Sequence, residues 1–287
     1  PNAGRWDNSE LMQRILRLRQ EKARLLGFAD FAALSLATKM ASSTDEVLAF
    51  LRDLGVRSRP AAQRELDELR AFAAREHGIA ALEAWDIPYY SEKLREALYD
   101  FNEEALRPYF PEDQVLRGLF SVVQQLYGLA VEEITDFERW HPSVRFFEIR
   151  DRAGEVRGRF YLDLYARAGK RGGAWMDDCI GRRRTTGGIQ TPVAYLVCNF
   201  QAPSGGKPAL FTHDEVTTLF HEFGHGLHHL LTRVEYLGVS GINGVKWDAV
   251  ELPSQFMENW CWEKRALDDL ARHFETGASL PDDLYKK

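Results

Sequence analysis

One short stretch of this sequence has the residue types and the spacing of a metal-dependent hydrolase, an H-E-x-x-H pattern at residues 221–225. His221 and His225 are four residues apart, so on an α-helix they lie on the same face and both imidazole rings can reach one metal ion. Glu222 lies to the side of this pair, where its carboxylate can hold and deprotonate a water molecule on the metal. The pattern therefore predicts a zinc hydrolase that acts on peptide bonds.

The residues around the motif predict the helix that it requires. Thr212 and Glu215 have the spacing of a capping box, with Thr212 as N-cap and the Glu215 carboxylate reaching back. Apolar residues then recur at helical spacing and would face a core: Val216, Leu219, Phe220, Phe223, Leu227, Leu230 and Leu231. The histidines fall on the opposite side of this helix. A solvated polar face without a metal is the alternative interpretation of that side.

A third histidine, His228, shares the face of His221 and His225. His221 and His228 are about 10 Å apart along the helix axis, so one tetrahedral ion cannot take all three rings. We expect His228 to support a metal ligand from outside the coordination sphere, to line the cleft, or to be solvated.

A hydrolytic zinc ion needs a third protein ligand and one open coordination position. A metzincin would have glycine and histidine where this chain has His228 and Leu231, so that class is excluded. The alternative is a carboxylate from a following helix. Pro253 is tolerated only near a helix start, which places Glu251 in or beside a first turn that a short loop can bring to the histidines. A plain carboxylate favoured by the helix dipole is the competing interpretation of Glu251.

These two segments resemble the thimet oligopeptidase family of zinc peptidases. Residues 221–228 and 250–260 carry the specific part of the resemblance. Supporting stretches extend it over most of the chain, at residues 6–8, 35–41, 160–165 and 197–200. The resemblance implies that His221, His225 and Glu251 bind one zinc ion and that Glu222 is the general base.

Members of that family are much longer than this chain. They have a helical region before the part that matches, and after it a segment whose tyrosine- and histidine-containing loop stabilises the tetrahedral intermediate. The resemblance therefore implies that this chain is part of a catalytic region, truncated at both ends, and weakly active or inactive alone. A non-catalytic zinc-binding fragment without that C-terminal segment is the alternative function.

The function expected from these residues is that of a zinc metalloendopeptidase, an oligopeptidase that hydrolyses internal bonds of short peptides. Glu222 would take a proton from the zinc-bound water and deliver it to the leaving amine. Glu258 lies seven residues after Glu251, two turns along the same helix face. We expect its carboxylate to orient one of the ligand histidines.

Composition excludes several other classes of function. The chain has 287 residues and a net charge of -6, which argues against a nucleic-acid partner. It contains no run of about 20 apolar residues, so we expect no membrane span. Three widely spaced cysteines indicate no disulfide framework and fit a reducing compartment: Cys179, Cys198 and Cys261. We therefore expect a cytoplasmic protein, and we expect it to be a monomer.

Helical periodicity dominates the first part of the chain. Helices are predicted at residues 10–26, 31–36 and 114–127. A further helix runs from Ser43 to about residue 54, and the helical pattern restarts at Pro60 and ends at residue 78. After a break at Pro88, Ser91 caps a helix that runs to Phe101. Strand patterns follow at 145–150 and 156–165, joined as a hairpin, and at 191–200. We interpret 191–200 either as an edge strand that binds an extended peptide or as an ordinary buried strand.

This order of elements predicts a mostly α fold of the α+β class. It would be a multi-helix, zincin-like catalytic domain with a small antiparallel or mixed sheet beside the zinc helix. We expect a helical region over residues 1–130 and a zinc-peptidase core over 131–287, forming one continuous catalytic domain.

Overall fold

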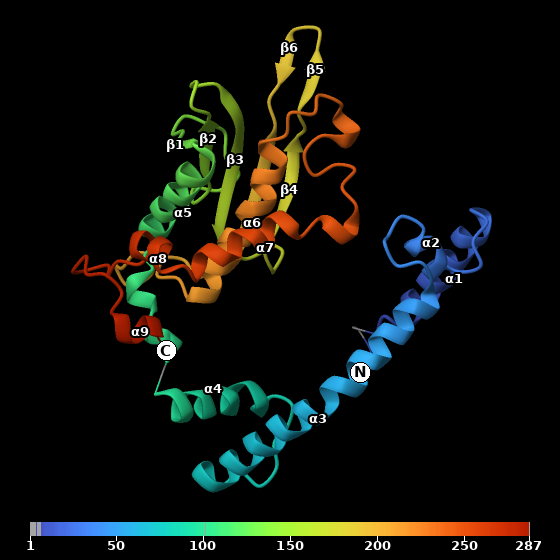
Figure 1. The fold of residues 1–287 in the computed structure, drawn as a ribbon, viewed down its shortest axis with the longest axis vertical. Coiled ribbons are helices and arrows are strands. Elements are labelled where there is room, and N and C mark those ends of the chain that lie inside the picture. The colour runs from blue at the N-terminus through green and yellow to red at the C-terminus, as the bar shows by residue number, and fades with distance from the viewer. Residues whose placement is uncertain (1–3, 5–6, 101, 287) are drawn as a thin grey trace. The chain divides into compact units, whose positions relative to one another are not determined.

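The computed structural model describes residue 4, residues 7–100 and residues 102–286 (Figure 1). Trp6 and Phe101, which the sequence patterns above include, lie outside the described residues. The chain divides into two compact units, one of Pro1–Leu94 with Lys246–Asp248 and the other of Arg95–Val245 with Ala249–Lys287. The expected division at residue 130 into a helical region and a peptidase core stays a prediction.

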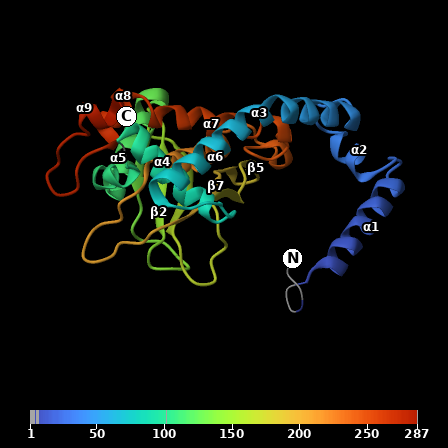
Figure 2. The same cartoon turned by 90° about the horizontal axis from the view of Figure 1, so that it is seen from below.

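The first unit is helical. Its elements are α1 (Ser9–Leu25), α2 (Phe31–Leu36), α3 (Thr44–His77) and most of α4 (Asp86–Tyr99). The Ser43 hydroxyl accepts the Glu46 N–H at 3.1 Å, so Ser43 is the N-cap of α3. At its other end α3 stops at Gly78, whose φ of 68° is a left-handed conformation that glycine adopts without strain. Figure 2 shows α3 as one long helix.

The helix breaks predicted at Pro60 and Pro88 were wrong. Pro60 lies inside α3, where it removes one helical hydrogen bond, but the surrounding turns are exposed and water can bond to the freed carbonyl. Pro88 lies in the first turn of α4, where no backbone N–H has a helical partner. As a result Ser91 lies within α4 and does not cap it.

The second unit contains a five-stranded mixed sheet with the strand order β1-β2-β3-β7-β4, and a separate β5–β6 hairpin. The bounds are β1 (Ala130–Glu133), β2 (Arg145–Arg150), β3 (Val156–Tyr165), β4 (Trp175–Ile180), β5 (Arg183–Thr185), β6 (Gly188–Gln190) and β7 (Val193–Phe200). The predicted β2–β3 hairpin is confirmed, with Phe147 opposite Phe160 in the antiparallel register. The β3–β7 pair is parallel and the other pairs are antiparallel.

The position of β7 corrects one expectation. Residues 191–200 do not form an edge, because β7 lies between β3 and β4. The apolar run of β7 fits a strand with neighbours on both sides. The edge beside it is β4, which exposes Asp177 and Asp178, as edge strands commonly do with charged residues.

One face of the sheet packs against α5 (Glu112–Tyr127) and α6 (His213–Leu230). The ring of Phe223 on α6 meets Phe160 on β3 edge to face, with centroids 5.3 Å apart. Phe120 on α5 meets Phe147 on β2 at 5.4 Å. The chain then continues through α7 (Leu252–Glu258), α8 (Lys264–Leu270) and α9 (Asp282–Lys286). The predicted mostly α, α+β fold with a small mixed sheet beside the helix of the H-E-x-x-H pattern is confirmed.

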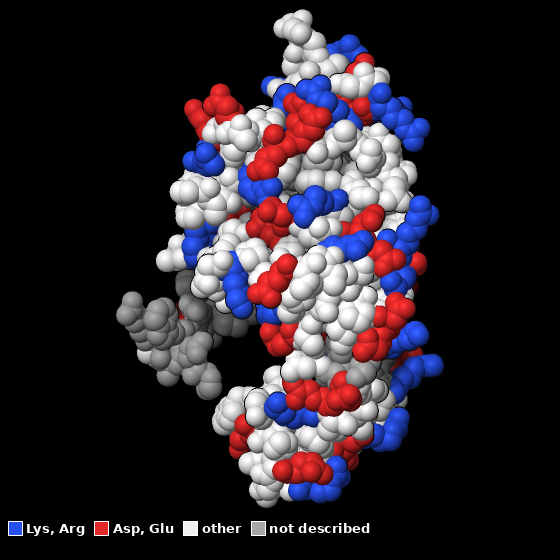
Figure 3. All heavy atoms as spheres, turned by 90° about the vertical axis from the view of Figure 1, so that its left-hand side faces the viewer, with Lys and Arg blue, Asp and Glu red and all other residues white. Residues whose placement is uncertain are grey.

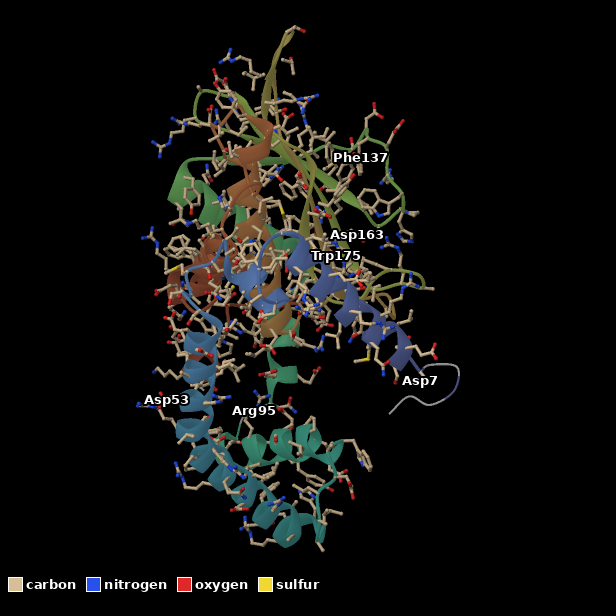
Figure 4. The ribbon with its side chains drawn as sticks, turned by 90° about the vertical axis from the view of Figure 1, so that its right-hand side faces the viewer. Asp7, Asp53, Arg95, Phe137, Asp163 and Trp175 are labelled. Carbon is tan, nitrogen blue, oxygen red and sulfur yellow. The ribbon has the colours of Figure 1, made fainter. Side chains whose placement is uncertain are left out.

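The other face of the sheet carries a charged network around Asp163 on β3, labelled in Figure 4. Asp163 is 2% exposed. Its carboxylate accepts hydrogen bonds from Arg167 at 2.7 and 2.8 Å, from Lys170 at 2.9 Å and from Trp140 at 3.0 Å. Burial raises the pKa of Asp163, but these hydrogen bonds outweigh it and lower the pKa to about 2. The network ties the segment after β3 to the sheet.

The surface is charged but mixed. On the face shown in Figure 3, acidic and basic side chains are interspersed over the described residues. None of the described helices combines the length and the apolar composition that crossing a bilayer requires.

Candidate metal centre

The helix that carries the H-E-x-x-H pattern is α6, and it begins as the sequence predicts. The Glu215 N–H donates to the Thr212 hydroxyl at 3.0 Å, and the Thr212 N–H donates to the Glu215 carboxylate at 2.8 Å, so the capping box is confirmed. Leu219, Phe220 and Phe223 are buried on the core side of α6. The rings of His221 and His225 are thereby held on the side away from the sheet.

A second helix, α7, brings a carboxylate to these rings. Glu251 immediately precedes α7, and Pro253 occupies its first turn, as the proline rule predicts. The two helices cross in contact at Gly224 of α6. A Cβ atom on Gly224 would lie 2.5 Å from the Pro253 carbonyl oxygen and 2.6 Å from the Ser254 Cα. Glycine at this position therefore permits the close approach that places Glu251 beside the histidines.

The ligand atoms of His221, His225 and Glu251 converge, and we call these three residues the candidate zinc site. Glu251 Oε2 lies 3.2 Å from His221 Nε2 and 3.1 Å from His225 Nε2. One ligand atom from each of the three residues lies within 4.8 Å of the other two. Among the described residues, this is the group of three or more His, Cys, Asp or Glu side chains whose ligand atoms come close enough to hold one metal ion. The two rings are nearly perpendicular, at 83°.

The donor set and its spacing fit one zinc ion. Two imidazole nitrogens and one carboxylate oxygen are a known ligand set of catalytic zinc and leave one position open. Ligand atoms bound tetrahedrally at about 2.0–2.1 Å are separated by about 3.3 Å, close to the 3.1 and 3.2 Å separations between Glu251 Oε2 and the two rings. Burial also lowers the pKa of His225, which favours the neutral ring that metal binding requires.

Glu258 contacts the other nitrogen of His221. The Nδ1 atom of His221 lies 2.6 Å from Glu258 Oε1, a distance at which Nδ1–H donates to the carboxylate. Nδ1 then carries the proton, and Nε2 presents its lone pair to the candidate zinc site. Glu258, whose carboxylate we expect to orient a ligand histidine, thus contacts His221.

Glu222 is the buried carboxylate beside the site, with 6% of its surface exposed. Burial raises its pKa to about 7; the charge of His221 opposes this shift, and the charge of Glu251 adds to it. A hydrogen bond from the Met176 backbone on β4 also lowers the pKa of Glu222. Glu222 is therefore poised to gain or lose a proton near neutral pH.

His228 does not join the candidate zinc site. It is partly buried, and its Nδ1 is buried without a hydrogen-bond partner among the described residues. It lines a cavity with residues of α7 and of the loop before α7. Of the three roles expected for His228, this position corresponds to lining a cleft.

Among the features beside the site that sequence reasoning missed are a strand and a histidine. The first is β4, which was not predicted because its sequence shows no clear alternation of apolar and polar residues. The backbone of its Met176 forms a hydrogen bond with Glu222. The second is His229, which is fully buried. Its Nε2 lies 3.0 Å from the Ile180 carbonyl oxygen at the end of β4, and its Nδ1 lies 3.5 Å from the Ile242 N–H. His229 thus links α6 to β4 and to the loop after α6. No sequence signal pointed to this role, because nothing in the sequence distinguishes His229 from the neighbouring histidines of α6.

Comparison with known proteins places these residues in a family. The model of Peptidase family M3 matches residues 1–287. The chain is 62% identical to oligopeptidase A of Escherichia coli over 288 residues, 100% of this chain and 42% of that protein. It is 39% identical to the dipeptidyl carboxypeptidase of Escherichia coli over 282 residues, 98% of this chain and 41% of that protein.

A more distant relative is the thimet-like oligopeptidase of Dictyostelium discoideum, 34% identical over 296 residues, which are 98% of this chain and 44% of that protein. The resemblance expected from the two motif segments is therefore confirmed. The chain spans less than half the length of each of these relatives. This chain belongs to peptidase family M3.

Proposed function

We propose that this chain carries the zinc centre of an oligopeptidase that hydrolyses internal bonds of short peptides. The observation that supports this most strongly is the position of Glu251 Oε2, within 3.2 Å of the Nε2 atoms of both His221 and His225. Membership of a peptidase family supports peptides as the substrate class. The chain covers 42% of the Escherichia coli oligopeptidase A, so the activity of the whole protein is part of this proposal.

The chemistry follows from the surroundings of each side chain. A zinc ion held by the candidate zinc site would polarise the scissile carbonyl and make a neighbouring water more acidic. Glu222, whose pKa burial raises to about 7, takes a proton from the attacking water and delivers it to the leaving amine. Glu258 holds the proton of His221 Nδ1 and so fixes the tautomer and the orientation of that ring.

The strand β4 supports a binding mode for the substrate. It is the last strand in the order of the five-stranded sheet, so one of its edges has no strand neighbour there. Its Met176 backbone donates to Glu222, which places β4 against the general base. An extended peptide that adds to such an edge forms main-chain hydrogen bonds with little dependence on sequence. We propose that β4, in place of residues 191–200, aligns the peptide past Glu222.

The test is a zinc analysis of the purified chain paired with cleavage of a fluorescence-quenched peptide blocked at both ends. Cleavage that stops with a chelator and returns with zinc supports the proposal. One zinc per chain without cleavage favours the alternative, a non-catalytic zinc-binding fragment. A chain that neither binds zinc nor cleaves the peptide contradicts both.

A second peptide with a free C-terminus addresses the kind of peptidase. One relative is named a dipeptidyl carboxypeptidase. Cleavage of the free peptide together with resistance of the blocked one would contradict an endopeptidase. The cytoplasmic location and the monomeric state expected from the sequence stay predictions.

A further inference from the structure

Ser254 contacts the ligand oxygen of the candidate zinc site. It is the third residue of α7 and is fully buried, with 0% of its surface exposed. Its Oγ lies 3.0 Å from Glu251 Oε2 and 2.8 Å from the Glu251 carbonyl oxygen. Oε2 is the same atom that lies 3.1 and 3.2 Å from the two histidine rings. The hydroxyl of Ser254 therefore touches Glu251 at its proposed metal-binding atom.

Of the three proposed ligands, Glu251 has the least support from its surroundings. Its side chain is 50% exposed, against 26% for His221 and 11% for His225. It makes no capping hydrogen bond to α7, although it precedes that helix. His221 and His225 instead project from a helix packed on the sheet, and His221 is also bonded to Glu258. A glutamate has several side-chain torsions to order, so a group that fixes the carboxylate beforehand raises metal affinity.

The hydroxyl has one proton and two acceptors within reach. An ionised carboxylate accepts a stronger hydrogen bond than a neutral carbonyl does. Because Ser254 is fully buried, water has no access to replace its hydroxyl in this contact. The Ser254 Cα also lies at the contact with Gly224, so α7 is held against α6 at the residue that touches Glu251.

We propose that Ser254 is a positioning residue that holds the Glu251 carboxylate towards His221 and His225 and thereby raises the affinity of the chain for zinc. It acts through Glu251 and does not touch the ion. This inference rests on the proposed zinc site. Loss of a group that orients a metal ligand typically weakens metal binding 10- to 100-fold.

The experiment measures the zinc dissociation constant of the whole chain by competition with a chromophoric chelator. Ser254→Ala is expected to weaken zinc binding about 10- to 100-fold. The matched control is Ser240→Ala, because Ser240 is also fully buried but its Oγ has no hydrogen-bond partner among the described residues. That control is expected to change the dissociation constant less than about twofold. Circular dichroism of the metal-free variants checks that each one is folded.

A double variant distinguishes a positioning role of Ser254 from a general effect of the substitution on the structure of α7. In a Glu251→Ala chain the hydroxyl has no carboxylate to hold, so adding Ser254→Ala should change the dissociation constant less than about twofold. A general structural effect would persist in that background. If Ser254→Ala does not fold, Ser254→Gly also removes the hydroxyl, adds no group that can bind zinc, and should bind zinc less tightly than the wild type.

Two results overturn the inference in distinguishable ways. A wild-type chain that binds zinc while Ser254→Ala, or the folded Ser254→Gly, binds it equally well removes Ser254 from this role and leaves the proposed function intact. A wild-type chain that binds no zinc contradicts the proposed function and this inference together.

Discussion

Gly224 of α6 lies against the backbone of Pro253 in α7, so closely that a Cβ atom on Gly224 would be 2.5 Å from the Pro253 carbonyl oxygen. The obstacle is backbone and cannot rotate away. The distance between the histidine-bearing helix and the helix that follows Glu251 is therefore set by the absence of a side chain at one position.

Gly224→Ala should force the two helices apart. We expect a loss of about 1–3 kcal/mol in the free energy of unfolding, which is typical of overpacking, and weaker zinc binding because Glu251 moves with α7. The control is Gly55→Ala in the exposed part of α3, where nothing lies within 4 Å of an added Cβ and alanine favours the helix. Urea unfolding and zinc competition measure both effects. Equal stability and zinc affinity in Gly224→Ala and the wild type would show that the crossing tolerates a methyl group.

Glu222→Gln should separate zinc binding from catalysis. The amide retains the shape of the side chain but cannot accept a proton from water, so we expect turnover to fall at least about 100-fold with the zinc content unchanged. The measurement is peptide cleavage by chains of equal zinc content. Turnover within a factor of two of the wild type would remove Glu222 from the role of general base.

Glu258→Ala should weaken zinc binding through His221. The Nδ1–H of His221 loses its acceptor at 2.6 Å, so the ring is free to rotate and we expect a 10- to 100-fold higher zinc dissociation constant. Glu258→Gln should have a smaller effect, because the amide oxygen can still accept the hydrogen bond. The exposed Glu263 supplies the control Glu263→Ala. Identical dissociation constants for Glu258→Ala and this control would contradict the prediction.

Asp163 should make the stability of the fold depend on acid pH. Its pKa is lowered from 3.8 to about 2 in the folded chain, so its ionised form stabilises the fold above the unfolded pKa, and this stabilisation is lost as the pH falls from about 5 towards 2. The shift corresponds to about 2–3 kcal/mol. Asp163→Asn should lose at least this much at pH 7 and should show a weaker pH dependence below pH 5.

The measurement for Asp163 is urea unfolding at a series of pH values from 7 to 3. The exposed Asp67 on α3 supplies the matched change Asp67→Asn, which should leave the pH dependence of unfolding nearly unchanged. A pH dependence as steep in Asp163→Asn as in the wild type would show that other carboxylates cause it.

The local rules of sequence reading located much of this structure. The pairing of Thr212 with Glu215 and the position of Pro253 fixed the starts of α6 and α7, because caps and first-turn prolines act within a few residues. The same rules failed at Pro60, where exposure of the helix to water decides whether a missing hydrogen bond breaks it. Whether a helix turn is exposed to water depends on the tertiary structure and cannot be predicted from the residues of that turn alone.

Contacts between distant segments were the other limit. The order of strands around β7 depends on pairing across the sheet, and no local pattern showed that β4 would form the edge. His229 and Ser254 were missed for the same reason, since their partners Ile180 and Glu251 become visible only when helices and strands are packed. Glu251 was found because its spacing from Pro253 and the family resemblance pointed to the same residue.

The proposed zinc centre requires three side chains to hold one metal ion. The decisive measurement is the zinc content of the dialysed wild-type chain and of Glu251→Ala, with His225→Ala as a second variant. We predict one zinc ion per wild-type chain and less than about a tenth of that in each variant, because two of the three ligands cannot retain the ion during dialysis. A wild-type chain without zinc, or a Glu251→Ala chain with as much zinc as the wild type, would contradict the account.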